Sequence, residues 1–283
     1  MTQNIRRYDV LIVGGGYNGL VAASYLAKAG KAVLLLDANA ELGGATTSVK
    51  PFPDYQARLS RYSYLVSLLP DQIVADLGIN FTTLGRSVAS YTPYHRDGRD
   101  DGLLVSTEWD ETTASSFKRL TGSDQESTAW REFYGEVAEL ARRFAPSLLK
   151  PLQTPAKLFD TDPERAKALA KERAIASLNQ YLLDPIESVL APCSIGSLAI
   201  EVKSPLDLEK DISLPRGNIF HRDLDFPFLD DHDRGARSQL WGAETDDPHI
   251  YLAGAGARRG GRVSGIAGHN AAMALLTKEY SGL

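Results

Sequence analysis

The chain has 283 residues, of which 43% are hydrophobic and 24% are charged, and this is the composition of an ordinary globular protein with a substantial core. The formal net charge of -5 argues against nucleic acid as the main partner, because phosphate binding needs clustered lysine and arginine. The single cysteine, Cys193, excludes an internal disulfide and makes a reducing cytoplasm the expected compartment.

The opening residues and the apolar runs predict neither a signal peptide nor a membrane span. The first apolar run, Val10–Val13, is short and leads directly into glycines instead of a small-residue cleavage site. No run approaches the roughly 18 apolar residues that a membrane helix requires. We therefore expect a protein that is neither secreted nor integral to a membrane.

The first predicted unit is a strand, a helix and a second strand. Residues 8–13 form an apolar run closed by three glycines, which is typical of a buried parallel strand. Residues 19–29 are rich in alanine and leucine and predict a helix that ends before Gly30. Residues 33–36 predict a second buried strand. Together these segments predict one right-handed βαβ unit.

The middle of the chain predicts helices and a junction. Residues 50–113 are mixed and loop-rich. From Trp130 to Phe144 apolar residues recur at spacings of three and four, which predicts an amphipathic helix with its stripe in a core. Residues 162–183 also predict a helix. Residues 184–210 carry prolines and change character several times, so the domain junction is expected there.

The C-terminal part predicts a strand, glycine turns and a helix. Residues 249–252 are expected to form a buried strand. Glycines follow at 254, 256, 260 and 261, and residues 265–277 predict a final helix.

A glycine motif lies at the first strand-to-helix turn. It has the pattern G-x-G-x-x-G and consists of Gly14, Gly15, Gly16, Tyr17, Asn18 and Gly19. The first glycine permits a tight turn, the third lets the backbone approach a pyrophosphate, and the last lets the helix pack on the strand. The helix N-terminus then offers free N–H groups and a partial positive charge to phosphates.

An acidic residue and a second glycine pair narrow the choice of dinucleotide. Asp37 ends the second strand, where its carboxylate can accept hydrogen bonds from a ribose diol. Ala38, the next residue, is also a candidate cofactor-binding residue. This acid suits NAD and FAD and disfavours NADP, whose 2′-phosphate it would repel. A glycine pair soon after the acid brings a second loop to the cofactor, as in many FAD enzymes. That loop comprises Gly43, Gly44, Ala45 and Thr46.

These motifs carry a family resemblance. Residues 10–47 resemble the FAD fingerprint of the amine oxidase and phytoene desaturase superfamily. Residues 251–272 are similar to the C-terminal FAD segment of phytoene desaturase-like flavoproteins, in which the last helix points its N-terminus at the flavin. The resemblance implies further cofactor-binding residues in this segment, namely Gly254, Ala255, Gly261, Arg262, Val263, Ser264 and Ala267.

Two more stretches, residues 60–69 and 205–224, resemble phytoene desaturase-related FAD-dependent oxidoreductases. The resemblance implies an α/β fold, with a Rossmann-like FAD-binding domain of the glutathione reductase type and a reduced, mainly helical second region. The FAD-binding domain is expected at residues 1–115 and 197–283, and the helical remnant of a substrate domain at residues 116–196.

Family members are usually much longer, and a central segment is missing here between about Val189 and Ser197. Three explanations stay open: a compact natural variant, an engineered deletion, or one half of a complex that another chain completes. A doubly wound sheet without some of its strands exposes apolar faces and edges. We therefore expect a homo-oligomer, or a hetero-oligomer with a chain that covers the gap.

No catalytic residue is assigned, and the candidates are His221, Arg61 and Tyr62. His221 lies in a segment that the resemblance places near the flavin, where it transfers a proton or serves as a hydrogen-bonded structural histidine. Arg61 and Tyr62 face the substrate or flavin, or they pack. No metal is expected, because the acidic stretch after His221 fits no zinc or calcium spacing and is typical of a solvated loop.

The resemblance implies an FAD-dependent oxidoreductase that oxidises a small or lipophilic substrate by hydride transfer to the flavin. One alternative is a non-catalytic protein that holds FAD and assembles with a partner chain. Another is a flavoprotein that catalyses an isomerisation or cyclisation, with the flavin as an electrostatic scaffold.

Overall fold

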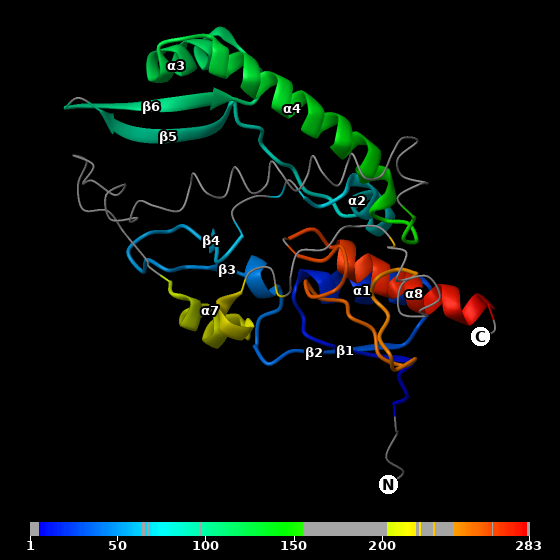
Figure 1. Cartoon of the computed structure of the whole chain (residues 1–283). Helices are drawn as coiled ribbons and strands as arrows, with labels where there is room; N and C mark the ends of the chain where they lie inside the picture. The colour runs from blue at the N-terminus through cyan, green and yellow to red at the C-terminus, as the bar shows by residue number, and fades with distance from the viewer. Residues whose placement is uncertain are drawn as a thin grey trace. The chain divides into compact units, whose positions relative to one another are not determined.

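The computed structural model describes the chain in two compact units (Figure 1). The first unit takes its described residues from the chain up to Phe81, from 146–154 and from 203 onward, and the second begins at Thr82 and runs to Ala145. The described residues are 6–63, 66, 68–96, 98–154, 203–218, 221, 229, 240–261 and 263–281.

The first unit is built on the predicted βαβ unit. Strands β1 (Val10–Val13) and β2 (Val33–Leu36) pair in parallel, from Val10 opposite Val33 to Val13 opposite Leu36. Helix α1 (Tyr17–Lys28) joins them and begins two residues earlier than predicted, because Gly16 already serves as its N-cap. After the helix, Gly30 has a φ of 83°, a left-handed conformation that glycine adopts without steric cost.

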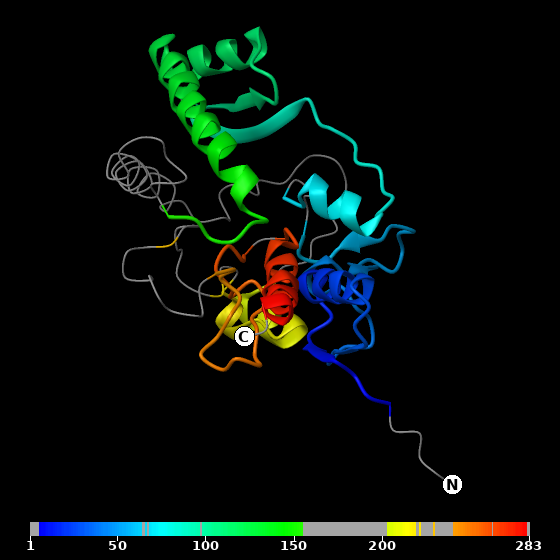
Figure 2. The ribbon, with the colours of Figure 1, turned by 90° about the vertical axis from the view of Figure 1, so that its right-hand side faces the viewer.

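Helix α8 (Ile266–Ser281) lies beside α1 (Figures 1 and 2). A Cβ on Gly268 would lie 2.0 Å from the carbonyl oxygen of Asn18, so only glycine permits this approach. The aromatic ring of Tyr25 packs edge-on against that of His269, with 4.9 Å between ring centroids. The core of the unit forms from one face of the sheet, from these two helices and from one residue of a short helix at Asp71–Leu77. Its buried residues are Ile12, Val21, Ala22, Tyr25, Leu26, Ile73 and Ala272.

Shorter elements complete the first unit. They are η1 (Gly44–Thr46), β3 (Ser48–Val49), β4 (Leu59–Ser60), α2 (Asp71–Leu77), α7 (Pro205–Ile212) and η4 (Pro215–Gly217). Helix α7 lies inside the segment that the sequence predicts as a junction. The helix begins here because Ser204 and Asp207 form a capping box. The Ser204 backbone N–H donates to the Asp207 carboxylate at 2.8 Å, and the Asp207 backbone N–H donates to Ser204 Oγ at 3.4 Å.

The predicted buried strand at 249–252 is wrong. Tyr251 makes only an isolated antiparallel bridge to Glu244, and the side chains of Ile250 and Leu252 are 54% and 46% exposed. An apolar run becomes a buried strand only where it pairs with the edge of a sheet and other elements cover its side chains. Among the described strands β1 pairs with β2 alone, and Val13 is 82% exposed.

The second unit holds a hairpin and two helices. Strands β5 (Val88–Arg96) and β6 (Arg99–Ser106) are antiparallel, and they lie in the segment that the sequence predicts to be loop-rich. Helix α3 (Glu111–Thr121) packs on β6, where the backbone N–H of Leu104 donates to Ser116 Oγ at 2.7 Å. The unit therefore contains sheet as well as helix.

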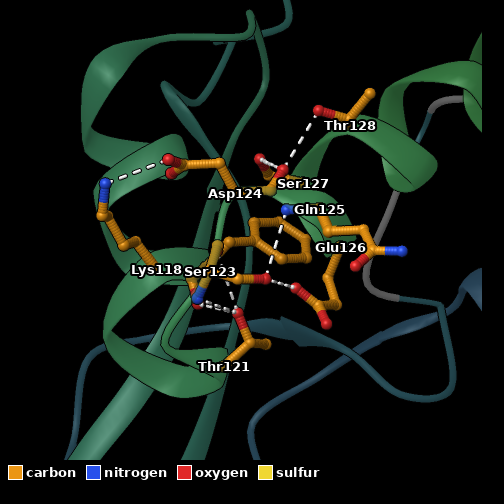
Figure 3. A network of polar contacts seen from close by, with 9 residues as sticks. Lys118, Thr121, Ser123, Asp124, Gln125, Glu126, Ser127 and Thr128 are labelled. Atoms are coloured by element: carbon orange, nitrogen blue, oxygen red, sulfur yellow. Dashed lines mark hydrogen bonds and ion pairs between the residues drawn. The ribbon is translucent and has the colours of Figure 1, made fainter.

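A polar turn joins α3 to α4 (Gln125–Phe144) (Figure 3). Lys118 Nζ contacts the Asp124 carboxylate at 3.0 Å, and Ser123 Oγ donates to Glu126 Oε2 at 2.5 Å. The hydroxyls of Ser127 and Thr128 donate to the Asp124 carbonyl oxygen at 2.9 and 3.0 Å. The backbone N–H of Gln125, one of the groups that the first turn of a helix leaves without an intrahelical partner, donates to Ser123 Oγ at 3.3 Å.

Helix α4 covers the predicted amphipathic helix and starts five residues earlier, at Gln125. Its stripe does not form the expected buried core, because the side chains of Tyr134 and Val137 are exposed. Trp130 does pack, with its ring centroid 5.5 Å from that of Phe117 on α3. None of the helices in the described ranges is long and apolar enough to cross a membrane.

Several predictions concern residues outside the described ones. These are the helix at 162–183, Cys193, the gap between about 189 and 197, and Arg262. The domain division at residues 115 and 197 stays a prediction, and the second compact unit starts earlier than that division, at Thr82.

Candidate dinucleotide-binding site

The first glycine loop connects β1 to α1. Gly14 has a φ of 103°, and its N–H extends the pairing of the strands by donating to the Leu36 carbonyl oxygen at 2.8 Å. A Cβ on Gly19 would lie 2.1 Å from the Gly14 carbonyl oxygen, so this glycine lets the helix pack on the turn. The tight turn and the close packing are therefore present, whereas the cofactor-binding role of these glycines stays a prediction.

A second glycine loop lies directly against the first. The Gly43 N–H donates to the Gly15 carbonyl oxygen at 2.8 Å, and Gly16 and Gly43 form a parallel bridge. A Cβ on Gly44 would lie 3.1 Å from the Cα of Gly16. A residue with a side chain at Gly44 would also be strained, because its φ is 57°. The two loops that the sequence assigns to one cofactor thus meet through their backbones.

Asp37 anchors the first loop. Its Oδ2 accepts from the Gly15 N–H at 2.6 Å, and its Oδ1 accepts from the Asn39 N–H at 2.7 Å. The bonds from Asn39 and then from Gly15 hold the pKa of the Asp37 carboxyl below its ordinary value, so the group is ionised at neutral pH. Each carboxylate oxygen has a second lone pair, which leaves acceptor capacity for a ribose hydroxyl.

Asn18 presents a polar atom that no group in the described protein satisfies. The residue is 6% exposed, and its Oδ1 is buried without a hydrogen-bond partner. It lies in the first turn of α1, whose N-cap Gly16 provides no side-chain cap. A buried acceptor of this kind is costly unless a donor meets it. The atom and the adjacent glycine backbones fit a dinucleotide with hydroxyl and phosphate groups.

The C-terminal glycine segment reaches the site through α8. Ser264 Oγ accepts from the Ile266 N–H at 3.3 Å at the start of the helix, and Ser264 and Ala267 are buried. The close approach of Gly268 to Asn18 brings the first turns of α8 and α1 together.

Among the remaining predicted residues of this segment, Arg262 is outside the described residues. Gly254 and Ala255 lie in a turn that the Ala257 N–H closes by donating to the Gly254 carbonyl oxygen at 3.0 Å, and Gly261 has a φ of 82°. No hydrogen bond within the described residues joins these three to the first two glycine loops. Arg259 clamps the segment, donating to the carbonyl oxygens of Ser147 and Trp241 at 2.8 and 2.9 Å.

Two of the three catalytic candidates, Arg61 and Tyr62, meet at one carboxylate. Arg61 and Tyr62 both bind Asp211 of α7, a residue that no sequence pattern singles out. His221 is exposed and has a φ of 60°. The segment from Ser204 to Asp207, with a serine cap and an acid three residues later, is a detectable helix start. Nothing local in the sequence, however, links Asp211 to residues that precede it by about 150 positions.

Comparisons with known proteins agree with this geometry. A family model described as "NAD(P)-binding Rossmann-like domain" matches residues 12–72, a span that contains both loops and Asp37. An uncharacterized protein of Mycobacterium tuberculosis is 42% identical over 154 residues, which are 54% of this chain and 28% of that protein. No solved structure matches.

Two further relatives have names that describe oxidoreductases. Pyridine nucleotide-disulfide oxidoreductase domain-containing protein 2 of Rattus norvegicus is 37% identical over 203 residues, covering 65% of this chain and 34% of that protein. One of the subunits of limonene dehydrogenase from Castellaniella defragrans is 28% identical over 148 residues, covering 50% and 25% respectively. The chain spans between a quarter and about a third of the length of these three relatives. It thus contains a dinucleotide-binding Rossmann domain similar to those of oxidoreductases.

Proposed function

We propose that the chain binds FAD and acts as an FAD-dependent oxidoreductase of the phytoene desaturase-like kind. The observation that carries the proposal is the backbone contact between the two glycine loops, with Gly43 bonded to Gly15 at 2.8 Å. NAD-only Rossmann domains do not usually need the second loop, whereas many FAD enzymes use it to complete the cofactor site. The names of the relatives support redox chemistry.

Each part of the site would bind a different part of FAD. The first loop and the N-terminus of α1 would bind the pyrophosphate, and the ionised Asp37 would bind a ribose diol. The N-terminus of α8 would direct a partial positive charge towards the flavin ring and favour negative charge there. FAD, when bound, supplies a hydride acceptor for a C–H or C–N bond of the substrate, and oxygen or a quinone would reoxidise it.

The proposal is tested by the absorption spectrum of the purified protein, with mass spectrometry of the released cofactor. We expect a flavin spectrum and the mass of FAD. A preparation that stays colourless after incubation with excess FAD would contradict the proposal. Parallel titrations with NAD and NADP separate a flavoprotein from a nicotinamide-binding one.

One observation favours a second candidate function, an FAD-binding chain that completes another protein. The outer face of the β1–β2 pair carries exposed apolar side chains, among them Leu11 and Val13. Such a face is typical of a surface that a partner covers. Photoreduction and stopped-flow reoxidation distinguish the two functions. An enzyme's flavin is reduced by substrate in the isolated chain, whereas the flavin of an assembly component is reduced only after the partner is added.

A further inference from the structure

The backbone of Arg61 and Tyr62 is hydrogen-bonded to the second glycine loop and the residue after it. The Arg61 N–H donates to the Thr47 carbonyl oxygen at 3.0 Å, and the Tyr62 N–H donates to the Ala45 carbonyl oxygen at 3.1 Å. These bonds continue the antiparallel pairing of β3 and β4, in which Ser48 lies opposite Ser60. A displacement of residues 61 and 62 is therefore transmitted to residues 45 to 47.

The side chains of the same two residues converge on one carboxylate. Arg61 Nη2 and the Tyr62 hydroxyl bind Asp211 Oδ2 at 2.6 and 2.7 Å. Lys203 Nζ reaches the same oxygen at 3.3 Å. The Asp211 side chain is 19% exposed, so its bonds are partly shielded from water. Charge-assisted hydrogen bonds of this kind are stronger than neutral ones.

The charge states suit this arrangement. The hydrogen bond from Tyr62 is the largest of several influences that hold the pKa of the Asp211 carboxyl below its ordinary value. Burial, followed by the bond to Asp211, raises the pKa of the Tyr62 phenol. Asp211 is thus an ionised acceptor and Tyr62 a protonated donor. This assigns Tyr62 a holding role and argues against its action as a base.

We infer that Asp211 is a positioning residue for the cofactor site, because it fixes the second glycine loop against the first from a helix about 150 residues further along the chain. The inference rests on the proposed function. Three hydrogen bonds connect Asp211 to the first loop: the Tyr62 hydroxyl binds Asp211, the Tyr62 N–H binds the Ala45 carbonyl oxygen, and the N–H of Gly43, in the same loop as Ala45, binds the Gly15 carbonyl oxygen. The loops approach so closely that a small shift of the second loop would deform the binding surface.

The first test is the Asp211→Asn variant, which keeps the size of the side chain and removes its charge. We expect FAD to bind about tenfold more weakly, which corresponds to the loss of one charge-assisted hydrogen bond. Affinity is measured by the change in flavin fluorescence on titration of the cofactor-free protein. The matched control is Glu209→Gln, the same change at an exposed position of α7, and it should leave affinity unchanged.

Two more measurements distinguish positioning from a merely structural role. The Asp211→Glu variant keeps the charge and should recover part of the affinity and of the bound-flavin circular dichroism. The gain in melting temperature on adding FAD should shrink in Asp211→Asn, because ligand stabilisation depends on the ratio of concentration to Kd. A lower melting temperature of the cofactor-free protein with an unchanged Kd would overturn the inference.

Hydrogen exchange makes this test independent of the proposed function. In the cofactor-free protein, Asp211→Asn should speed the exchange of amides in residues 43–62 and leave those of α1 unchanged. If the wild-type protein binds no FAD, the proposed function fails and the exchange data still decide whether Asp211 holds the loop. Equal exchange in variant and wild type would sink the inference even where FAD binds.

Discussion

At the scale of single residues, the glycines of the first loop have different tasks that the sequence pattern does not separate. A Cβ on Gly19 collides with the Gly14 carbonyl oxygen, whereas a Cβ on Gly16 would meet nothing closer than the Cα of Gly44 at 4.0 Å. Gly19 therefore serves the packing of the protein itself. The space above Gly16 is open, as a site for an approaching pyrophosphate requires.

This difference predicts opposite behaviour of two Gly→Ala variants. Gly19→Ala should destabilise the cofactor-free protein by about 1–3 kcal/mol, the usual cost of overpacking. Gly16→Ala should leave its melting temperature unchanged and weaken FAD binding by at least about tenfold, since a methyl group would occupy the ligand's place. Thermal unfolding and flavin titration check both variants. Normal FAD affinity in Gly16→Ala would remove Gly16 from the site.

The meeting of the two glycine loops follows from positions that are close in the sequence, whereas their role in binding a cofactor stays a prediction. The turn, the acid and the second glycine pair occur within residues 14 to 46, so local spacing is enough to place them together. Asp211 could not be predicted in the same way. Its role arises from a contact with Tyr62 that only the folded chain creates.

At the scale of elements, the pairing of α1 with α8 depends on Gly268 and on the neighbouring His269. Gly268→Ala should lower stability by about 1–3 kcal/mol, because the new methyl group would force the helices apart at Asn18. The matched control is Gly135→Ala in α4, where a Cβ meets nothing within 4 Å. That substitution should stabilise its helix by roughly 0.5–1 kcal/mol. Chemical denaturation measures both effects, and equal effects would contradict the packing argument.

His269, which packs between these two helices, should make the free energy of unfolding depend on pH. Burial is the main cause that lowers the pKa of His269 below its ordinary value of 6.5, while its bond to Asn270 and the charge of Asp76 act in the opposite direction. Below pH 6.5 the unfolded chain gains a proton that the folded state resists. The free energy of unfolding should therefore fall as the pH drops below this ordinary value and level off below the folded-state pKa.

The His269→Gln variant should lose this part of the pH dependence. Urea denaturation between about pH 7.5 and pH 5, a range that brackets the ordinary histidine pKa, measures it. His249→Gln is the control because that side chain is exposed. An NMR titration of the wild-type imidazole reports the pKa directly, in case the variant folds poorly. Identical slopes in wild type and His269→Gln would show that the histidine titrates normally.

The predicted helices agree better with the structure than the predicted strands do. A helix satisfies its hydrogen bonds within one segment, so the spacing of apolar residues from Trp130 to Phe144 locates α4 correctly. A strand needs a neighbour. The hairpin of β5 and β6 escapes prediction because its burial comes from α3, and residues 249–252 have strand-like composition without a paired edge.

At the scale of the whole molecule, sequence patterns identify the Rossmann unit but not where the compact units divide. The second compact unit begins at Thr82, whereas the resemblance implies a domain division at residue 115, which stays a prediction. The hairpin that starts at Val88 belongs with α3, and this association is a tertiary contact without a local pattern. The start of this compact unit is therefore set by tertiary packing.

The β1–β2 pair leads to a prediction about assembly. Helix α1 covers one face of β1 and β2, and on the other face Leu11 and Val13 are 57% and 82% exposed. Parallel strands are normally buried on both faces, so an uncovered apolar face favours association. We expect the purified chain to self-associate through this face in size-exclusion chromatography with light scattering.

The Leu11→Gln variant should weaken that association without reducing FAD binding, since Leu11 points away from α1 and its Ile12 neighbour supplies the core contact. The matched control is Leu84→Gln. Leu84 is 93% exposed and lies outside helices and strands, so this variant should leave the mass of the assembly measured by light scattering unchanged. A wild-type monomer that retains FAD would show that the exposed face needs no cover. Association that survives Leu11→Gln unchanged would locate the interface elsewhere.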